Sequence, residues 1–350
     1  MNIHEKYMRR CIELGKKGLG SATPNPMVGC VVVCGDRIIG EGFTSPYGGP
    51  HAEVNAIRSV KDEQLLKKSS LYVTLEPCSH FGKTPPCSDL IIASGIPKIF
   101  IGLQDPHDKV AGNGIQKLKD AGCEVTVGIL DKECRDHHKR FLTYQEQKRP
   151  YIILKWAETQ DGFIAPTIEK RKGNPQPFWI TNGYSKQLVH KWRSEEQGIL
   201  VGTQTVMDDN PKLTVRNWEG KSPVRVVLDR DLKTPQEFHV LDGDEQTIVL
   251  TAVAETKKYR DGIAYEIIDF GQPLAAQISA VLYRHQITSV IIEGGAQTLQ
   301  TFIYENLWDE ARVFKGTIIF GDGILAPEIS ESPTKTESIL ADTLSLYYND

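Results

Sequence analysis

Strand-like and helix-like segments alternate along the whole chain, and this alternation constrains the fold more than any other feature. Short apolar runs rich in Val, Ile and Leu recur between longer segments with apolar residues at helical spacing. A run of the first kind is typical of a buried strand, and a segment of the second kind is typical of a surface helix. The alternation therefore predicts an α/β architecture in which helices are layered on sheets.

The length of 350 residues predicts two domains, and we place their boundary at Lys148-Arg149-Pro150. In the first half we expect helices at 3–17, 51–60, 87–93, 114–121 and 131–147, a hairpin at 28–42, and strands at 71–77, 98–103 and 123–129. In the second half we expect strands at 151–157, 198–202, 224–229, 247–252, 265–269 and 289–295, helices at 186–194, 274–284 and 296–305, and a turn-rich loop at 173–177.

The composition argues against several classes of protein. The net charge is −4 and the pI is about 6.2, without the basic excess of a nucleic-acid binder, so nucleic acid is not an expected partner. No stretch approaches the roughly 18 apolar residues of a membrane span, and the first residues do not resemble a signal peptide. Seven cysteines, all before residue 135 and without disulfide spacing, fit a reducing compartment. We therefore expect a cytoplasmic protein without a membrane partner.

One group of residues in the first half carries a clear chemical signal. His51 and Glu53 are separated by one residue, and Cys78 and Cys87 each follow a proline further along. A catalytic zinc site has three protein ligands and an open position for water, which one imidazole and two thiolates supply. Glu53 can then move protons as a general acid and base. The pattern matches the zinc-deaminase signature H-x-E … P-C-x-x-C, except that eight residues separate the cysteines.

Other interpretations stay open at this stage. His80 would complete a four-coordinate structural zinc site, as in a regulatory protein without turnover, or Cys78 and Cys87 would be buried core thiols. A deaminase of flipped bases in nucleic acid is disfavoured by the acidic balance and the long cysteine spacing.

The second half is less informative by itself. It lacks the G-x-G-x-x-G sequence of a standard dinucleotide site. Gly294-Gly295 stands between an expected strand and an expected helix, where glycines can let a phosphate reach the helix N-terminus. The same pair can also serve only as a tight turn.

Nearly the whole chain resembles the bifunctional deaminase–reductase family of riboflavin biosynthesis. The segments that carry the resemblance are TPNPMVG (23–29), GPHAEVNAI (49–57), TLEPCSHFGKTPPC (74–87), LKWAETQDGFIA (154–165), FWITNG (178–183), HKWRS (190–194), ILVGTQTVMDDNPKLTVR (199–216) and IIEGG (291–295). The resemblance implies a cytidine-deaminase-like three-layer domain over residues 1–148 and a dihydrofolate-reductase-like domain over residues 149–350. A deaminase whose second half only binds substrate is the rival to this expectation.

The resemblance also implies the cofactors, the substrate and the site residues. Zn²⁺ would be held by His51, Cys78 and Cys87, with Glu53 moving protons. Asn25, His80 and Lys83 would face the substrate in the first domain, and Arg193, Leu213, Arg216 and Glu293 in the second. NADPH would be lined by Ala157, Trp179, Thr205, Asp209 and Gly295. The implied substrate is a pyrimidine ribosylamine phosphate, 2,5-diamino-6-(5-phosphoribosylamino)pyrimidin-4(3H)-one, which is deaminated and then reduced. A homo-oligomer is compatible with the family.

This sequence departs from the family pattern at several positions. Thr44 stands where the family commonly has His, and Asp105-Pro106-His107-Asp108 replaces D-P-N-P. Phe163 replaces a common Lys, and Pro177 replaces a Ser. These departures fall near the implied substrate and cofactor sites rather than on the implied zinc ligands.

Overall fold

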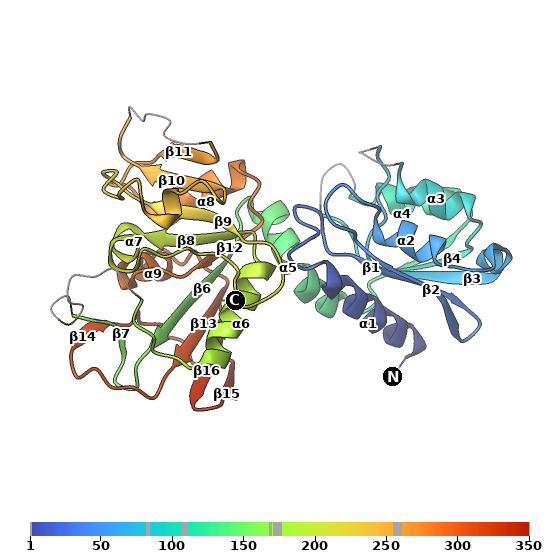
Figure 1. Ribbon diagram of the computed structural model, residues 1–350. Helices are drawn as coiled ribbons and strands as arrows, with labels where there is room; N and C mark the ends of the chain where they lie inside the picture. Colours follow the sequence, from blue (N-terminus) through green and yellow to red (C-terminus); the bar gives the residue numbers. More distant parts are fainter. Residues whose placement is uncertain are drawn as a thin grey trace. The chain divides into compact units, whose positions relative to one another are not determined.

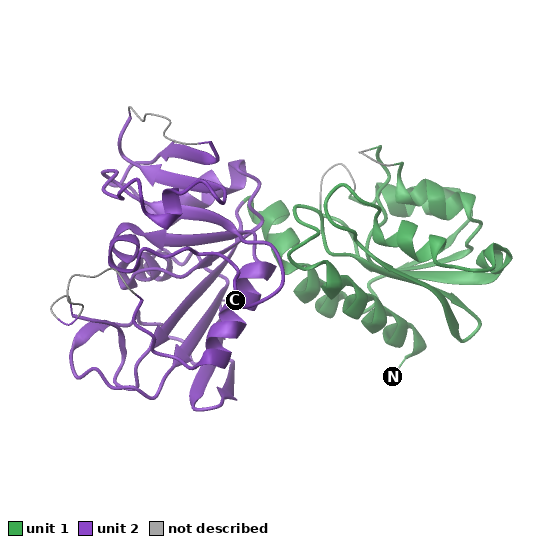
Figure 2. Ribbon diagram, in the orientation of Figure 1, with its two compact units in different colours: residues 1–148 green, residues 149–350 purple. Residues whose placement is uncertain are grey.

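The computed structural model describes residues 2–81, 85–106, 111–167, 170, 177–254 and 261–349. The chain forms two compact units, Met1–Lys148 and Arg149–Asp350, which Figure 2 colours separately. Each unit has its own sheet and its own apolar core. Among the described residues, no helix is long and apolar enough to cross a membrane. Of the predicted loop at 173–177, only Pro177 lies within the described residues.

The first unit is built on a five-stranded sheet in the order β2-β1-β3-β4-β5. Its strands are β1 (Gly29–Cys34), β2 (Arg37–Phe43), β3 (Ser69–Leu75), β4 (Lys98–Leu103) and β5 (Glu124–Val127). β1 pairs antiparallel with β2 and β3, whereas β3, β4 and β5 run parallel. Its helices are α1 (Ile3–Gly15), α2 (Ala52–Arg58), α3 (Cys87–Ala93), α4 (Asn113–Asp120) and α5 (Asp131–Gln147), with short 3₁₀ turns η1 (Lys16–Gly18) and η2 (Glu63–Lys68).

Helices cover both faces of this sheet. In Figure 1, α2, α3 and α4 lie on one face and α1 lies on the other. α5 shares the face of α1, because Met8 of α1 and Cys134 of α5 both approach the same side of Gly102 in β4. The result is the three-layer α/β arrangement that the sequence predicts for this half.

Two glycines let helices approach the β1–β2 hairpin closely. A Cβ atom on Gly29 would lie 1.8 Å from the backbone oxygen of Cys11 in α1. A Cβ atom on Gly42 would lie 2.4 Å from the backbone oxygen of Ala52 in α2. Backbone therefore packs against backbone at both places, and the start of α2 is fixed on the sheet.

The second unit is built on a nine-stranded sheet in the order β11-β10-β9-β8-β12-β6-β13-β16-β15. Its strands are β6 (Tyr151–Glu158), β8 (Gly198–Gly202), β9 (Val224–Leu228), β10 (Thr247–Thr251), β11 (Ile263–Ile267), β12 (Ser289–Ile292), β13 (Glu310–Lys315), β15 (Lys335–Ile339) and β16 (Asp342–Tyr348). The strands from β11 to β13 pair parallel, and β16 and β15 add antiparallel. β7 (Phe163–Pro166) and β14 (Gly323–Leu325) form a separate antiparallel pair.

The helices of the second unit divide between the two faces of its sheet. They are α6 (Gly183–Glu195), α7 (Thr203–Asp209), α8 (Leu274–Arg284) and α9 (Ala296–Tyr304), with a 3₁₀ turn η4 (His239–Leu241). Along β6, Ile152 and Leu154 belong to the core under α8 and α9, whereas Ile153 belongs to the core under α6 and α7. This alternation follows from the period of two along a strand.

Every helix and strand predicted above has a counterpart in the structure. α7, β7 and the strands from β13 to β16 were not predicted from the sequence. α7 has only seven residues, too few for a helical pattern to stand out. β13 reads EARVFK, whose charged residues mask the apolar positions of a buried strand.

Candidate metal centre and reductase site

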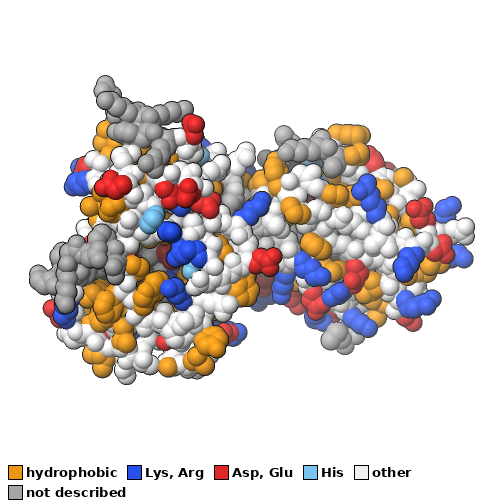
Figure 3. All heavy atoms as spheres, viewed as in Figure 1, with side chains coloured by type: hydrophobic (Ala, Val, Ile, Leu, Met, Phe, Trp, Pro, Cys, Tyr) orange, Lys and Arg blue, Asp and Glu red, His pale blue; other side chains and the backbone are white. Residues whose placement is uncertain are grey.

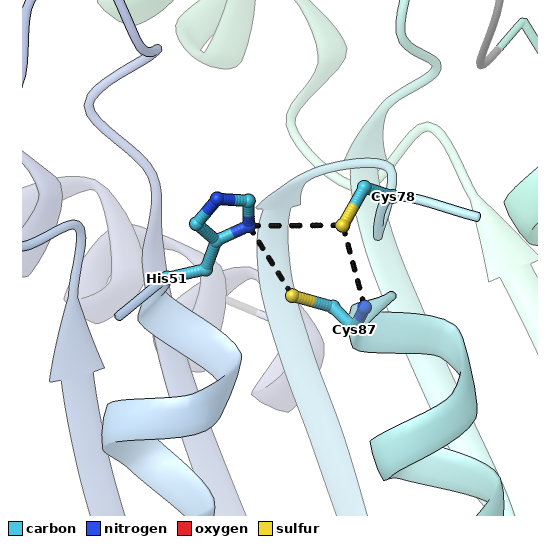
Figure 4. Close-up of side chains that lie close together, drawn as sticks. All are labelled: His51, Cys78 and Cys87. Carbon is cyan, nitrogen blue, oxygen red and sulfur yellow. Dashed lines mark hydrogen bonds between the residues drawn. The ribbon is translucent and has the colours of Figure 1, made fainter. Parts of the chain in front are cut away.

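Three side chains from separate parts of the first unit converge on one point. His51 caps the start of α2, Cys78 follows β3, and Cys87 opens α3. The Nδ1 atom of His51 lies 3.3 Å from Cys87 Sγ and 3.7 Å from Cys78 Sγ (Figure 4). Ligands at the corners of a zinc tetrahedron lie about 3.5 Å apart, given metal–ligand bonds of about 2.0–2.3 Å. Both sulfur atoms therefore lie at the distance from His51 Nδ1 that a shared zinc ion requires, and all three ligand atoms lie within 4.8 Å of one another.

The two thiols at this point share protons unequally. The pKa of Cys78 is lowered to about 4 by a hydrogen bond from Cys87 and, further, by His51. The pKa of Cys87 is raised by the same hydrogen bond and by burial, and that of His51 is raised by its bond with Cys78. The backbone N–H of Cys87 also donates to Cys78 Sγ over 3.3 Å. A divalent cation here would stabilise both thiolates.

Glu53 lies beside the three ligands in the first turn of α2 without belonging to the ligand group. Its side chain is buried, with 4% of its surface exposed. Its pKa is raised to about 7, first by burial and then by the charge on Cys78. A carboxyl group in this condition can both accept and release a proton near neutral pH.

The loop between the two cysteines does not add a fourth ligand from its described residues. His80 is exposed and lies outside the ligand group, so the four-coordinate alternative is not supported. The alternative of isolated core thiols is not supported either, because both sulfur atoms contact His51. Lys83 lies outside the described residues.

The segment that carries Asn25 is tied down by residues on both sides. Thr44 Oγ1 accepts the N–H of Val28 over 3.0 Å and donates to the carbonyl of Pro26 over 3.0 Å. His137 Nε2 donates to the carbonyl of Met27 over 2.7 Å. Thr44, where the family commonly has His, is thus buried and holds the backbone of this segment. The half-buried side chain of Asn25 has no hydrogen bond within the described part of the chain, which leaves its amide available to a ligand.

A buried ionic cluster marks the second unit. Arg193 of α6 grips Glu293, which follows β12, through Nε at 2.8 Å and Nη2 at 2.7 Å. The Nζ atom of Lys155 in β6 lies 3.7 Å from the same carboxylate. The Glu293 side chain is only 7% exposed. Although burial opposes it, Arg193 and Lys155 lower the pKa of Glu293 to about 2.

Further basic groups surround this cluster. Arg216 donates from Nη1 to Thr214 Oγ1, and its backbone N–H donates to His190 Nδ1 over 3.2 Å. Burial, with Arg193 and Arg216 nearby, lowers the pKa of His190 to about 4, so His190 is neutral at pH 7. On the visible face of this unit, basic side chains gather beside histidines (Figure 3).

The segment from 210 to 216 is held in a strained conformation. Leu213 is buried and has φ of +57°, a region that residues other than glycine seldom adopt. The fully buried guanidinium of Arg225 in β9 donates from Nε to the carbonyl of Lys212 over 3.0 Å and from Nη1 to His239 and Asp242. Arg225 thereby fixes the residue before Leu213.

Four of the five residues predicted to line NADPH come from neighbouring elements at the carboxyl ends of parallel strands, and the fifth, Trp179, precedes α6. Ala157 lies in β6, Thr205 and Asp209 lie in α7 directly after β8, and Gly295 lies between β12 and α9. A Cβ atom on Gly295, whose φ is +69°, would lie 3.4 Å from Thr205 Oγ1. Trp179 is half exposed beneath the Lys186 ammonium, 3.5 Å from the ring centroid. Ligands of open parallel sheets bind at such strand ends.

The two residues of this unit that depart from the family pattern, Phe163 and Pro177, differ in their surroundings. Phe163 starts β7, and its ring packs beside Gly323 of β14. Its backbone N–H donates to Thr159 Oγ1 over 2.9 Å. Pro177 is exposed.

Several residues that support these sites could not be singled out from the sequence. Lys155 stands in a quoted family segment, but nothing in its spacing distinguishes it from a surface lysine. His137 was hidden inside a charged helical stretch, and Glu76 directly precedes the Pro-Cys pair. Buried polar groups of this kind become visible only when the fold shows what they bind.

Two family models match the chain. The cytidine and deoxycytidylate deaminase zinc-binding region matches residues 1–103, which include the ligand group. The RibD C-terminal domain matches residues 150–342, which include the ionic cluster.

Relatives and solved structures extend the similarity over nearly the whole chain. The riboflavin biosynthesis protein RibD of Aquifex aeolicus is 40% identical over 92% of this chain and 89% of its own length. That of Escherichia coli is 32% identical over 91% of this chain and 88% of its own. A crystal structure of a diaminohydroxyphosphoribosylaminopyrimidine deaminase/5-amino-6-(5-phosphoribosylamino)uracil reductase from Thermotoga maritima is 39% identical, with a TM-score of 0.87 and 98% coverage of both chains. Acinetobacter baumannii RibD is 32% identical, with a TM-score of 0.87 and coverage of 99% and 98%.

Proposed function

This chain belongs to the RibD family of bifunctional riboflavin-biosynthesis enzymes, and from that premise we propose which side chains carry its two reactions. The chain is a zinc-dependent deaminase joined to an NADPH-dependent reductase. The first reaction hydrolyses an amino group from 2,5-diamino-6-(5-phosphoribosylamino)pyrimidin-4(3H)-one. The second reduces the ribosyl group to give 5-amino-6-(5-phosphoribitylamino)uracil. We assign the first reaction to residues 1–148 and the second to residues 149–350.

In the deaminase, His51, Cys78 and Cys87 would hold the zinc ion. The single observation that carries this assignment is the convergence of their three ligand atoms within 4.8 Å of one another. Bound zinc supplies a Lewis acid that lowers the pKa of a water molecule. Glu53, buried beside the ligands, would accept a proton from the attacking water and deliver it to the departing amine.

The remaining deaminase residues would bind and orient the pyrimidine. Asn25 offers both a donor and an acceptor to the edge of a base, and Thr44 and His137 hold the backbone on its C-terminal side. His80 and Lys83, in the loop between the cysteines, would also contact the substrate.

In the reductase, the ionic cluster would bind the phosphoribosyl group. Two nitrogens of Arg193, Nε and Nη2, already donate to Glu293. Because fewer of its donors remain for a phosphate, we assign the main phosphate contact to Arg216. Leu213 would also face the substrate, and Glu293 would face the sugar as a carboxylate stabilised by Arg193 and Lys155. Bidentate contact between guanidinium and phosphate is strong and directional.

NADPH would lie against Ala157, Trp179, Thr205, Asp209 and Gly295. The nicotinamide supplies the hydride for the ribosyl carbon, and the chain supplies the position of the two reactants. Glycine at position 295 leaves room for a close approach of the cofactor to the backbone.

We further propose a cytoplasmic enzyme that acts on a free small molecule and not on nucleic acid. All seven cysteines are free thiols, which suits a reducing compartment. A homo-oligomer is supported by large apolar side chains exposed in the second unit, among them Ile319, Leu325 and Leu340. Light scattering of the purified protein measures the number of copies.

Product analysis by mass spectrometry tests the proposed function. Zinc-loaded protein is incubated with the diaminopyrimidinone ribosylamine phosphate, with and without NADPH. We expect the aminouracil alone without NADPH and the ribityl product with it. Deamination without consumption of NADPH would contradict the reductase assignment, and the absence of both products would contradict the substrate assignment.

A further inference from the structure

The carboxylate of Glu76 sits in a nest of backbone N–H groups two residues before Cys78. Its Oε1 atom accepts from Gly114 at 2.9 Å and Ile115 at 3.1 Å. Its Oε2 atom accepts from Gly112 at 3.0 Å and Asp105 at 3.2 Å. The side chain is buried, with 4% exposed. Four hydrogen bonds to one charged, buried group are a strong and rigid arrangement.

These four donors come from two places in the chain, the end of β4 and the start of α4. Asp105 follows β4, whereas Gly112, Gly114 and Ile115 form the start of α4. Gly112, the N-cap of α4, has no side chain to bind the free N–H groups of the first turn, so the Glu76 carboxylate replaces that cap. A negative charge at this end of a helix is also favoured by the helix dipole.

The contact fixes the backbone that leads into Cys78. A Cβ atom on Gly114 would lie 2.1 Å from the carbonyl oxygen of Pro77, so the start of α4 packs directly against the Pro77 peptide. On the other side, the backbone oxygen of Cys78 accepts the N–H of Ser88 over 3.1 Å. The backbone at Cys78 is therefore fixed on both sides. Before Cys78, Glu76 bonds to the start of α4, and at Cys78 the backbone carbonyl bonds to the start of α3.

We propose that Glu76 is a positioning residue of the deaminase site, which holds Cys78 Sγ at the distance from His51 that zinc requires. This role rests on the proposed zinc ligands, and it adds a residue that does not touch metal or substrate. A charge-bearing carboxylate is needed, because both of its oxygens must accept. In Glu76→Gln one oxygen becomes an NH₂ group that faces two donors, so two bonds are lost at unchanged size.

The test measures zinc release and the cobalt spectrum in the full-length protein. E76Q is expected to release zinc to a chelator about tenfold faster or more, the usual range when a group that orients a ligand is removed. The cobalt-substituted protein should show altered d–d bands, because the cysteine ligand moves. Deaminase kcat should fall by at least about tenfold, whereas reductase activity should stay unchanged.

Glu305→Gln is the matched control. Glu305 also accepts backbone N–H groups at a helix start, from Ala275 at 3.1 Å and Ala276 at 3.2 Å, but it lies in the second unit. E305Q should leave zinc release and the cobalt spectrum unchanged. The same zinc release and spectrum in E76Q as in the parent would overturn the proposal, whatever the change in melting temperature.

A second variant, Glu76→Asp, tests the proposal if E76Q does not fold. Zinc binding by the unsubstituted (parent) protein tests the zinc ligands separately. Glu76→Asp keeps the charge but draws it back by one methylene, so it should release zinc faster than the parent and more slowly than E76Q. Parental zinc release and an unchanged cobalt spectrum in E76D would overturn the proposal. Failure of the parent itself to bind zinc through His51, Cys78 and Cys87 would instead contradict the proposed function.

Discussion

The two sites of this chain are built in different ways. The proposed metal centre would take its three ligands and its proton-transfer group from two short motifs, at the start of α2 and between β3 and α3. The proposed reductase site would take its charged groups from β6, α6, the segment after α7 and the end of β12. Hydrogen bonds from backbone N–H groups position the first site. Ion pairs between Glu293 and the cations Arg193 and Lys155 position the second.

This difference decides how each site responds to damage. A zinc ligand set is cooperative, because loss of one thiolate leaves too few ligands to retain the metal. The ionic cluster is a balance of charges, because removal of its carboxylate leaves buried cations without compensation. The deaminase should therefore fail through loss of metal, and the reductase through loss of charge balance.

The largest effect is expected from Cys87→Ser. This variant should lose zinc and reduce deaminase kcat by more than about 1,000-fold, because the acidity of the attacking water depends on the metal. Reductase activity on the deaminated aminouracil should be unchanged. Metal content and both activities are measured, with Cys34→Ser as the control from the hairpin of the same unit. Zinc retained at one ion per chain in C87S would contradict the ligand assignment.

The charge balance of the reductase is broken by Glu293→Gln. The variant leaves Lys155 and Arg193 facing a neutral amide, and we expect the second unit to lose about 3–5 kcal/mol of stability. Reductase activity should fall while deaminase activity and zinc content stay the same. Glu266→Gln is the control, because Glu266 pairs with Arg284 and His285 at the surface of the same unit. A reductase that tolerates E293Q as well as E266Q would show that the reductase activity does not depend on this charge.

A smaller effect is expected from acid on the first unit. Burial, together with Lys16 and Arg140, outweighs the bond to Met27 and lowers the pKa of His137 to about 4. In the unfolded chain His137 binds a proton below about pH 6.5, whereas in the folded chain it stays neutral down to about pH 4. The stability that the neutral, buried His137 contributes is therefore fully present above pH 6.5 and is lost as the pH falls toward 4. Between pH 7 and pH 5 it amounts to about 2 kcal/mol.

His137→Gln checks this pH dependence. Gln keeps a donor for the Met27 carbonyl but does not titrate. Calorimetry of the full chain identifies the transition of the first unit as the one that added zinc raises. That transition should depend less on pH in H137Q than in the parent, and equal pH dependence would rule out the role of His137.

The most local effect concerns Thr44, which departs from the family. Thr44→Val leaves the Val28 N–H and the Pro26 carbonyl without their partner, at a cost of about 1–3 kcal/mol. Because the Asn25 segment loosens, KM of the deaminase should rise more than kcat falls. Ser94→Ala removes a hydroxyl that bonds only within α3's own C-terminal turn and serves as the control. A KM unchanged in T44V would separate Thr44 from substrate binding.

The residue pattern alone predicted the three proposed zinc ligands, which the structure brings together, whereas the proposed reductase residues were predicted only by resemblance. His51, Cys78 and Cys87 form a recognisable donor set because zinc fixes both the residue types and their number. Arg193 and Glu293 belong to elements 100 residues apart, and no spacing rule pairs them. Glu76 and Arg225 bind backbone atoms, so their partners could not be found without the fold. The α/β class followed from the alternation of elements, whereas the order of the nine strands did not.

The measurement that tests the separation of the two sites most directly uses Glu53→Ala. The variant is supplied with NADPH and either the diaminopyrimidinone ribosylamine phosphate or the already deaminated aminouracil, and the products are identified by mass spectrometry. We predict that E53A keeps its zinc, forms no product from the first compound, and converts the second to the ribityl product at the parental rate. Loss of both conversions in a zinc-loaded, folded E53A would contradict the account of two independent sites.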